Sequence, residues 1–243
     1  MNTHSDLPII DVLEHGAGDQ QMDQRLFMQL VVMDAPQVDP AEAIRALIAE
    51  LERNEIPCVL YADLNHPQGF ALLTWSTDPS WFVQRVRPLL SSETLRQLQV
   101  GVRQAWTMTG RTYSSGYEQD LEWMLLKRPI ENVTRTDWPW AVWYPLRRKG
   151  SFAQLEGREQ GSILREHAHL GRAYGEQGHA HDVRLACHGL DAQDNDFVIG
   201  LMSQDLHRIS HVVQSMRKTR QTSEFIAAMG PFFVGYRLFV RSA

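Results

Sequence analysis

The feature that most constrains this chain is an order of predicted secondary-structure elements that occurs twice. Strand-like apolar runs, turns and helical patterns follow one another in the first half, and the order strand, turn, strand, helix, strand returns roughly 120 residues later. Chains that repeat one such order fold as two similar units that bury their apolar faces against each other. The pattern therefore predicts a duplicated protein that mixes strands and helices.

The first unit follows a polar, weakly patterned stretch. Apolar residues from Ile44 to Leu51 recur at i, i+3, i+4 and i+7, which predicts a helix that begins near Pro40. Asp78 followed by Pro79 is typical of the start of a second helix. The strands expected in this unit cover residues 25–33, 58–63, 70–75 and 102–113.

The second unit has strand signals at 182–187, 197–202 and 231–240, and a helix is expected to begin at Asp205. We therefore expect an α+β fold of two ferredoxin-like halves packed side by side, with antiparallel sheets and with helices on the outside, as in a duplicated dimeric α+β barrel. The expected boundaries are an N-terminal arm over 1–24, an N-terminal half over 25–118 and a C-terminal half over 119–243.

The composition and the motifs argue against several classes of function. With 43% apolar residues, 243 residues are enough to bury a substantial core, so intrinsic disorder is not expected. The formal net charge of -5, from 29 acidic and 24 basic residues, gives no positive field to attract nucleic acid, and no such partner is expected. No GxGxxG, P-loop or nucleophile-elbow motif occurs, so nicotinamide, nucleoside triphosphate and serine hydrolase functions lack support.

Cysteine usage and hydropathy indicate the compartment. Cys58 and Cys187 are far apart and lack CxxC spacing, which favours a reducing environment. The first 20 residues lack a basic region followed by an apolar one, and no window approaches 18 uninterrupted apolar residues. We expect a cytoplasmic protein without membrane insertion.

His167 is the histidine best placed to be a ligand. It lies in a helical stretch over 157–170, where Ile163 and Leu170 share its face, so its imidazole is expected to point into the apolar interior. A histidine there is either a core residue satisfied by a hydrogen bond or an axial ligand to haem iron. Spacing alone leaves both open.

The aromatic segment over 138–148, WPWAVWYPLRR, is the second unusual stretch. It is either a buried strand end with arginines in solvent or the wall of a large planar cofactor. In the second case Tyr144 would be a redox-active phenol beside the cofactor, and the arginines would hold anionic propionates.

Several separated motifs in one order resemble the haem domain of coproheme decarboxylases and chlorite dismutases. They are WYPLRR, REHAHLGRAY, GLDAQDNDFVIG, MRKTRQTSEF and GPFFVG, between about Trp143 and Gly235. The resemblance implies that His167 is the proximal ligand to the iron. It also implies that Tyr144 is the catalytic phenol of the decarboxylases, which becomes a radical and takes hydrogen from a propionate.

The same resemblance carries over further cofactor-binding positions. Leu146 replaces the methionine of the decarboxylases' Tyr-Pro-Met segment, Arg148 is the basic residue expected to meet a propionate, and Ser223 matches a serine with that role. The resemblance implies that the cofactor is haem, either iron coproporphyrin III or haem b.

The side of the haem opposite the proximal histidine is where this sequence departs from the family. Asp182 and Arg184 share one face of the predicted strand, and either is expected to look toward the iron. Chlorite dismutases have an arginine there and many decarboxylases a glutamine. If the residue is Asp182, its carboxylate would repel the chlorite anion; if it is Arg184, chlorite chemistry is favoured.

The leading hypothesis is therefore a coproheme decarboxylase that converts two propionates to vinyls with hydrogen peroxide. The alternatives are a chlorite dismutase, a haem-binding or sensing protein without turnover, and a duplicated barrel whose haem site has decayed. Relatives form rings, typically of five subunits, so the resemblance also implies a homo-oligomer.

Overall fold

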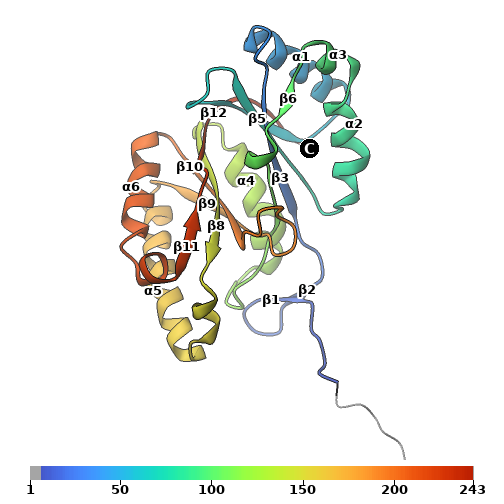
Figure 1. Ribbon diagram of the computed structural model, residues 1–243. Coiled ribbons are helices and arrows are strands. Elements are labelled where there is room, and N and C mark those ends of the chain that lie inside the picture. Colours follow the sequence, from blue (N-terminus) through green and yellow to red (C-terminus); the bar gives the residue numbers. More distant parts are fainter. Residues whose placement is uncertain (1–6, 243) are drawn as a thin grey trace, which may run out of the picture.

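The N-terminal half contains a four-stranded unit with its helices on one face. The computed structural model describes residues 7–242 (Figure 1). The elements of this half are β3 (Phe27–Asp34), α1 (Pro40–Arg53), β4 (Cys58–Asp63), β5 (Gly69–Ser76), the π-helical turn η1 (Phe82–Val86), α2 (Arg87–Leu90), α3 (Glu93–Gln97), β6 (Gly101–Val102), the 3-10 turn η2 (Gln104–Trp106) and β7 (Met108–Arg111).

The C-terminal half begins with a connecting helix and then repeats this order. Its elements are η3 (Trp123–Lys127), α4 (Arg128–Thr134), β8 (Trp140–Arg148), η4 (Gly150–Gln154), α5 (Gly157–Glu176), β9 (His181–Ala186), β10 (Phe197–Ser203), α6 (Leu206–Met216), α7 (Arg220–Phe225), β11 (Ile226–Met229) and β12 (Phe233–Arg241).

The strand pairings confirm the predicted fold class. The N-terminal half has the order β7-β3-β5-β4, and the C-terminal half has the equivalent order β12-β8-β10-β9. In each half the fourth strand lies beside the first and the third beside the second, with antiparallel pairing, which is the ferredoxin-like arrangement. Because β4 pairs with β12 and β7 with β9, the two halves close into one ring, and β6 and β11 branch from it.

The two junctions between the halves differ in extent. β4 and β12 pair along most of their length, whereas β7 and β9 meet at a single register pair, Arg111 and Ala186. Helix α4 lies beside the unpaired part of β9, where the Asn132 side-chain amide donates to the Asp182 carbonyl over 3.0 Å. The helix thus satisfies a backbone acceptor that the short pairing leaves free.

Side chains alternate between the ring interior and the helix-covered outer faces, as the period of a strand requires. The interior cluster combines residues of both halves, including Trp143 and Phe233 at 0% exposure. Gly200 borders it, because a Cβ at this position would lie 2.6 Å from the Trp143 ring. The outer face of each half packs under its own helices as a separate apolar cluster.

Several element boundaries differ from those expected. The strand predicted over 102–113 is interrupted by η2, so that β6 and β7 both pair with β3 on the same side. The last strand begins at Phe233, and β11 precedes it as a short separate strand on β8. Helix α6 begins where expected, because the Asp205 carboxylate accepts from the Arg208 amide over 2.9 Å.

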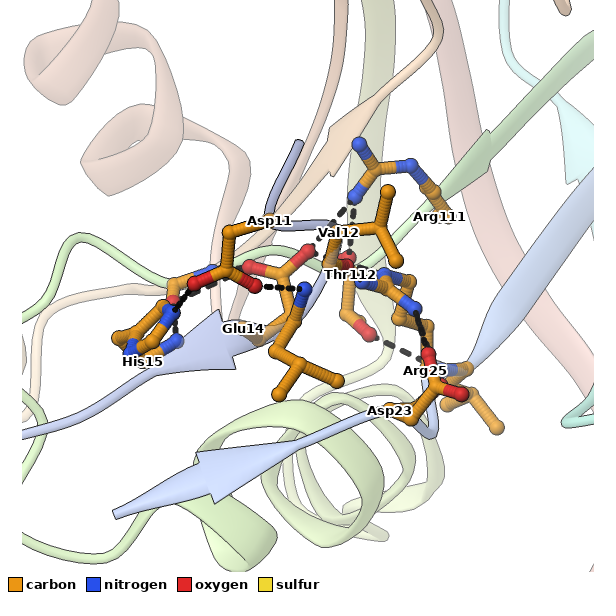
Figure 2. A network of polar contacts seen from close by, with 11 residues as sticks. Asp11, Val12, Glu14, His15, Asp23, Arg25, Arg111 and Thr112 are labelled. Atoms are coloured by element: carbon orange, nitrogen blue, oxygen red, sulfur yellow. Dashed lines mark hydrogen bonds and ion pairs between the residues drawn. The ribbon is translucent and has the colours of Figure 1, made fainter. Parts of the chain in front are cut away.

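The predicted N-terminal arm is only partly without regular structure. Residues 1–6 lie outside the described part of the chain, whereas β1 (Glu14–His15) and β2 (Gln21–Met22) form a small hairpin. Figure 2 shows the Glu14 carboxylate among its partners: it accepts from Arg25 over 3.0 Å and from Arg111 over 2.9 Å. The boundaries between arm and halves remain a prediction.

Within residues 7–242, no helix is long and apolar enough to cross a membrane.

Candidate functional site

The outer face of the C-terminal sheet brings the sequence-predicted residues into neighbouring rows. The register places Ile199 of β10 between Tyr144 of β8 and Arg184 of β9. In the next row Leu201 lies between Val142 and Asp182 in the same way. With neighbouring strands about 4.8 Å apart, the backbones that carry Tyr144 and Arg184 are about 10 Å apart.

Asp182 and Arg184 form an ion pair, so neither acts alone on this face. The Arg184 Nε lies 3.1 Å from Asp182 Oδ2, and Arg128 of α4 donates to Asp182 Oδ1. Burial opposes ionisation of Asp182, but the two guanidinium groups outweigh it and lower the pKa of this carboxyl to about 2. The three residues therefore carry one net positive charge at neutral pH.

His167 lies on the flank of α5 that faces the sheet, together with Ile163, the only buried residue of this helix. Its Nδ1 is 3.1 Å from the Thr219 hydroxyl oxygen, and that hydroxyl donates to the Met216 carbonyl over 2.8 Å. Because the hydroxyl hydrogen is used, Nδ1 is the donor in the bond to Thr219. The proton thus sits on Nδ1, and the lone pair of Nε2 is available.

Electrostatics also keep His167 neutral. Burial lowers the pKa of its imidazole, and the positive charges of Arg184 and Arg148 lower it further. A neutral imidazole with a free Nε2 is the form that binds a metal, and the hydrogen bond at the other nitrogen fixes its orientation.

Arg148 is a half-buried cation whose guanidinium forms no ion pair with the described residues. Its guanidinium lies between the rings of Phe152, at 4.4 Å, and Phe197, at 4.8 Å, and its Nε makes no hydrogen bond. Its burial lowers the pKa of the guanidinium, and no carboxylate of the described residues forms an ion pair with it. A buried N–H donor without a hydrogen-bond acceptor is suited to bind a carboxylate that a ligand supplies.

Tyr144 is held in a defined orientation. Its ring stacks on Phe232 with the centroids 4.5 Å apart and an interplanar angle of 23°. Burial raises the pKa of the phenol, and the negative charge of Asp182 raises it further, so the hydroxyl is protonated at neutral pH. Leu146, two residues along β8, belongs to the same outer apolar cluster, directly opposite Phe197.

The Ser223 hydroxyl already has a hydrogen-bond acceptor within its own helix. It lies on α7 and donates to the Thr219 carbonyl over 3.0 Å, in the helical i to i−4 pattern. It is therefore one helical turn from the partner of His167, and its expected contact with a propionate remains a prediction.

Sequence reasoning missed three residues of this site. Thr219 lies within the MRKTRQTSEF stretch, but no local signal marks it as a histidine partner. Tyr113, just after β7, packs its ring 5.6 Å from Phe197, so the N-terminal half contributes to the site. Arg128 reaches it from α4. Tyr113 depends on the junction between the halves, which no pattern within one half reveals, and Arg128 lies 54 positions before its partner Asp182.

A hollow of about 480 Å³ lies between α5 and the end of α6. Its lining consists of Glu166, His169, Leu170, Ala173, Ser215, Lys218 and Thr219. Thr219 therefore faces the hollow and also accepts the hydrogen bond of His167, whereas Tyr144 and Arg184 do not line it.

Two ferredoxin-like halves close into one ring, and His167, Asp182 and Arg184 gather under the helices of the second half. This arrangement describes a dimeric α+β barrel fused within one chain. The chain belongs to the chlorite dismutase family, whose family model matches residues 40–238.

Solved structures show the same fold. A haem-binding protein from Thermus thermophilus is 19% identical, with a TM-score of 0.67 over 89% of this chain and 92% of its own. A chlorite dismutase from Candidatus Nitrospira defluvii, in complex with imidazole, is 12% identical, with a TM-score of 0.67 over 90% of this chain and 93% of its own. No curated protein matches the sequence.

Proposed function

We propose that this protein binds haem on the outer face of its C-terminal half, with Nε2 of His167 as the axial ligand to the iron. The observation that supports this most directly is the hydrogen bond from His167 Nδ1 to Thr219. This bond leaves Nε2 free and fixes the orientation of the ring. Membership of the chlorite dismutase family and the similarity to a haem-binding protein support the same proposal.

The residues present fit an iron porphyrin in three respects. His167 supplies a neutral nitrogen ligand. Arg148 supplies a half-buried cation whose buried Nε makes no hydrogen bond, which suits a propionate. Phe197 and Ile199 lie on the outer face of β10, are only partly buried by protein and can cover a macrocycle face.

We propose further that the bound group is iron coproporphyrin III and that the reaction is its oxidative decarboxylation by hydrogen peroxide. Haem iron supplies the one-electron chemistry with peroxide. Per propionate, one peroxide is consumed, and a vinyl group, one carbon dioxide and two waters are formed. Tyr144 would pass a hydrogen atom from the propionate side chain toward the oxidant.

Several properties of Tyr144 suit this role. The phenol is protonated, since burial and Asp182 raise its pKa, so it holds the hydrogen that a relay needs. The stacked Phe232 ring limits its movement. Arg148 lies on the same outer face of β8, four residues along, where a propionate bound to its guanidinium would be near the phenol.

The test adds hydrogen peroxide to the coproheme complex and follows the porphyrin by mass spectrometry. The proposal predicts two successive losses, each of one carbon dioxide and two hydrogens. Tyr144→Phe should retain coproheme but lose turnover, whereas Tyr117→Phe, at a tyrosine that is 82% exposed, should match the wild type. Full turnover by Tyr144→Phe would remove this residue from the mechanism.

Chlorite dismutation is the second candidate, and the position of Arg184 favours it. This guanidinium occupies the same row of the outer face as Tyr144, and the cluster with Arg128 and Asp182 keeps a net positive charge. A positive group there would attract chlorite. Oxygen evolution from chlorite that disappears in Arg184→Ala would establish this reaction, and its absence from the wild type would exclude it.

A further inference from the structure

Helix α6 carries two histidines on its exposed side. His207 and His211 are four residues apart, the spacing that places two side chains on one face of a helix. Both are exposed, whereas Ile209 and Val212 of the same helix are buried at 1% and 3% exposure in the outer apolar cluster. Figure 1 shows α6 at the outer edge of the molecule, beside α5. The pair therefore projects into solvent from a backbone that its packing holds in place.

The two imidazole rings lie close enough to share one metal ion. Their centroids are 6.1 Å apart, and the interplanar angle is 50°. A metal lies about 2.0–2.1 Å from a ligating histidine nitrogen, so two rings that share an ion have centroids about 5 to 6 Å apart. A small rotation of two exposed side chains is enough to bring both Nε2 atoms to one ion.

Tyr174 of α5 holds the ring of His211 from its other nitrogen. The phenol oxygen lies 2.7 Å from His211 Nδ1, and the phenol donates to Ser215 Oγ over 2.8 Å. A metal at Nε2 requires that the imidazole proton is on Nδ1, and the phenol oxygen can accept this proton because its own hydrogen is bonded to Ser215. A hydrogen bond at the second nitrogen orients a ligating histidine and fixes its tautomer.

Arg208, which lies between the two histidines in the sequence, is directed elsewhere. Its Nε lies 3.1 Å from Asp205 Oδ2, and its Nη1 donates to Gln204 over 2.9 Å. These contacts hold the guanidinium toward the start of α6 and offset its charge. Its repulsion of a cation between the two imidazole rings is reduced accordingly.

The available donor atoms select the class of metal. Imidazole nitrogen suits Zn²⁺ and Cu²⁺, whereas Ca²⁺ and Mg²⁺ prefer oxygen. The free thiols of Cys58 and Cys187 are both buried. Within residues 7–242, no three His, Cys, Asp or Glu side chains are grouped so as to hold a metal. The protein would thus supply two ligands from α6, and water would complete the coordination.

We propose that His207 and His211 bind one divalent ion of the copper and zinc class through their Nε2 atoms, with Tyr174 as the positioning residue for His211. A pair of histidines at i and i+4 on one helix face is the arrangement that binds zinc in the HExxH motif. Cu²⁺ should bind more tightly than Zn²⁺, as it does at most nitrogen sites. The site contains none of the residues proposed to bind haem, so it can fail without affecting that proposal.

The test titrates the chelator-treated full-length protein with Cu²⁺ and records electron paramagnetic resonance spectra. The wild type should bind one ion tightly, with superhyperfine splitting from two nitrogens. His207→Ala and His211→Ala should each lose this splitting and the tight binding. His169→Ala is the matched control at an exposed histidine of α5 with Ala173 four residues along, and it should behave as the wild type does. His167→Ala should also keep the signal, because its imidazole belongs to the proposed haem site.

Tyr174→Phe tests the positioning role. Isothermal titration with Zn²⁺ should show binding of one ion that is about 10- to 100-fold weaker than in the wild type, with an unchanged far-ultraviolet circular dichroism spectrum. Unchanged affinity in this variant would remove Tyr174 from the site. A wild type that does not bind either metal, or wild-type affinity and splitting in His207→Ala and His211→Ala, would overturn the proposal as a whole.

Discussion

The two halves share one topology but differ in what their helices cover. On the outer face of the N-terminal half, β4 presents Cys58 and Leu60, both at 0% exposure, beneath the helical layer. The equivalent strand of the C-terminal half, β9, presents Asp182 and Arg184. The same position in the repeated fold thus carries an apolar core in one half and an ion pair in the other.

The crossover helices show the same contrast. Helix α1 buries four of its 14 residues, among them Leu47 and Leu51 at 0% exposure. Helix α5 has 20 residues and buries only Ile163, and His167 occupies its sheet-facing flank. A helix packed this sparsely derives little stability from its own contacts.

The two halves of this duplicated fold therefore have different roles. The N-terminal half stabilises the ring through a closely packed apolar layer. The C-terminal half places ionisable groups under a helix, where their burial shifts pKa values and favours ligand chemistry. Substitutions at equivalent positions should therefore affect stability in one half and binding in the other.

The largest effect should come from the N-terminal core. Leu47→Ala removes a fully buried side chain and should lower the free energy of unfolding by about 3 kcal/mol. Haem affinity should stay unchanged at temperatures where the variant is folded. Urea denaturation of the apo protein measures the first quantity and an absorption titration the second. A stability loss below about 1 kcal/mol would contradict the assignment of this layer as the stabilising one.

The next effect concerns the orientation of His167. Thr219→Val removes the acceptor of its Nδ1 hydrogen and should weaken haem binding by about 10- to 100-fold, as removal of a histidine partner does at metal sites. Thr219→Ser keeps the hydroxyl and is the matched control, with affinity close to the wild type. Equal loss in both variants would show that the hydrogen bond has no role.

Arg148 should matter for the carboxylates of the ligand. Arg148→Gln is expected to weaken coproheme binding about 10-fold, because it removes one charge-assisted hydrogen bond. Competition between coproheme and the same porphyrin as its tetramethyl ester measures this. The variant should lose most of the preference for the free acid, and an unchanged preference would place the carboxylates elsewhere.

The smallest effect is the acid dependence of stability. Asp182 has a pKa of about 2 in the folded protein against an ordinary value of 3.8, so its contribution is present above about pH 4 and is lost as the pH falls toward 2. The shift sets an upper bound of about 2 kcal/mol, and solvent screening of a 33% exposed side chain reduces it to about 1 kcal/mol.

Urea denaturation at pH 7 and pH 3 measures this contribution. Asp182→Asn should be less stable at pH 7 and should lose less stability on acidification than the wild type. Asp137→Asn is the control at an exposed ion pair and should behave as the wild type does. An unchanged acid dependence in Asp182→Asn would show that the ion pair with Arg184 does not stabilise the fold.

The fold could be predicted because its signals are local. Apolar periodicity marked α1 and most strands, Asp205 marked the start of α6, and the repeated order gave the two halves. The positions of Tyr144, Asp182 and Arg184 on one face also followed from the alternation of side chains along strands.

Long-range contacts could not be predicted in the same way. The bond between His167 and Thr219 joins residues 52 positions apart, and the ion pair of Arg128 with Asp182 spans 54 positions. Neither has a spacing rule. From the sequence we expected either Asp182 or Arg184 to face the ligand alone. In the structure the two side chains form an ion pair.

The central claim is that the C-terminal half binds haem through His167. The most direct measurement is an absorption titration of the wild type, His167→Ala and Leu47→Ala with haem b and with coproheme. The account predicts tight binding with a histidine-ligated spectrum in the wild type and in Leu47→Ala, and at least a 100-fold weaker complex without that spectrum in His167→Ala. Identical spectra and affinities in all three proteins would contradict it.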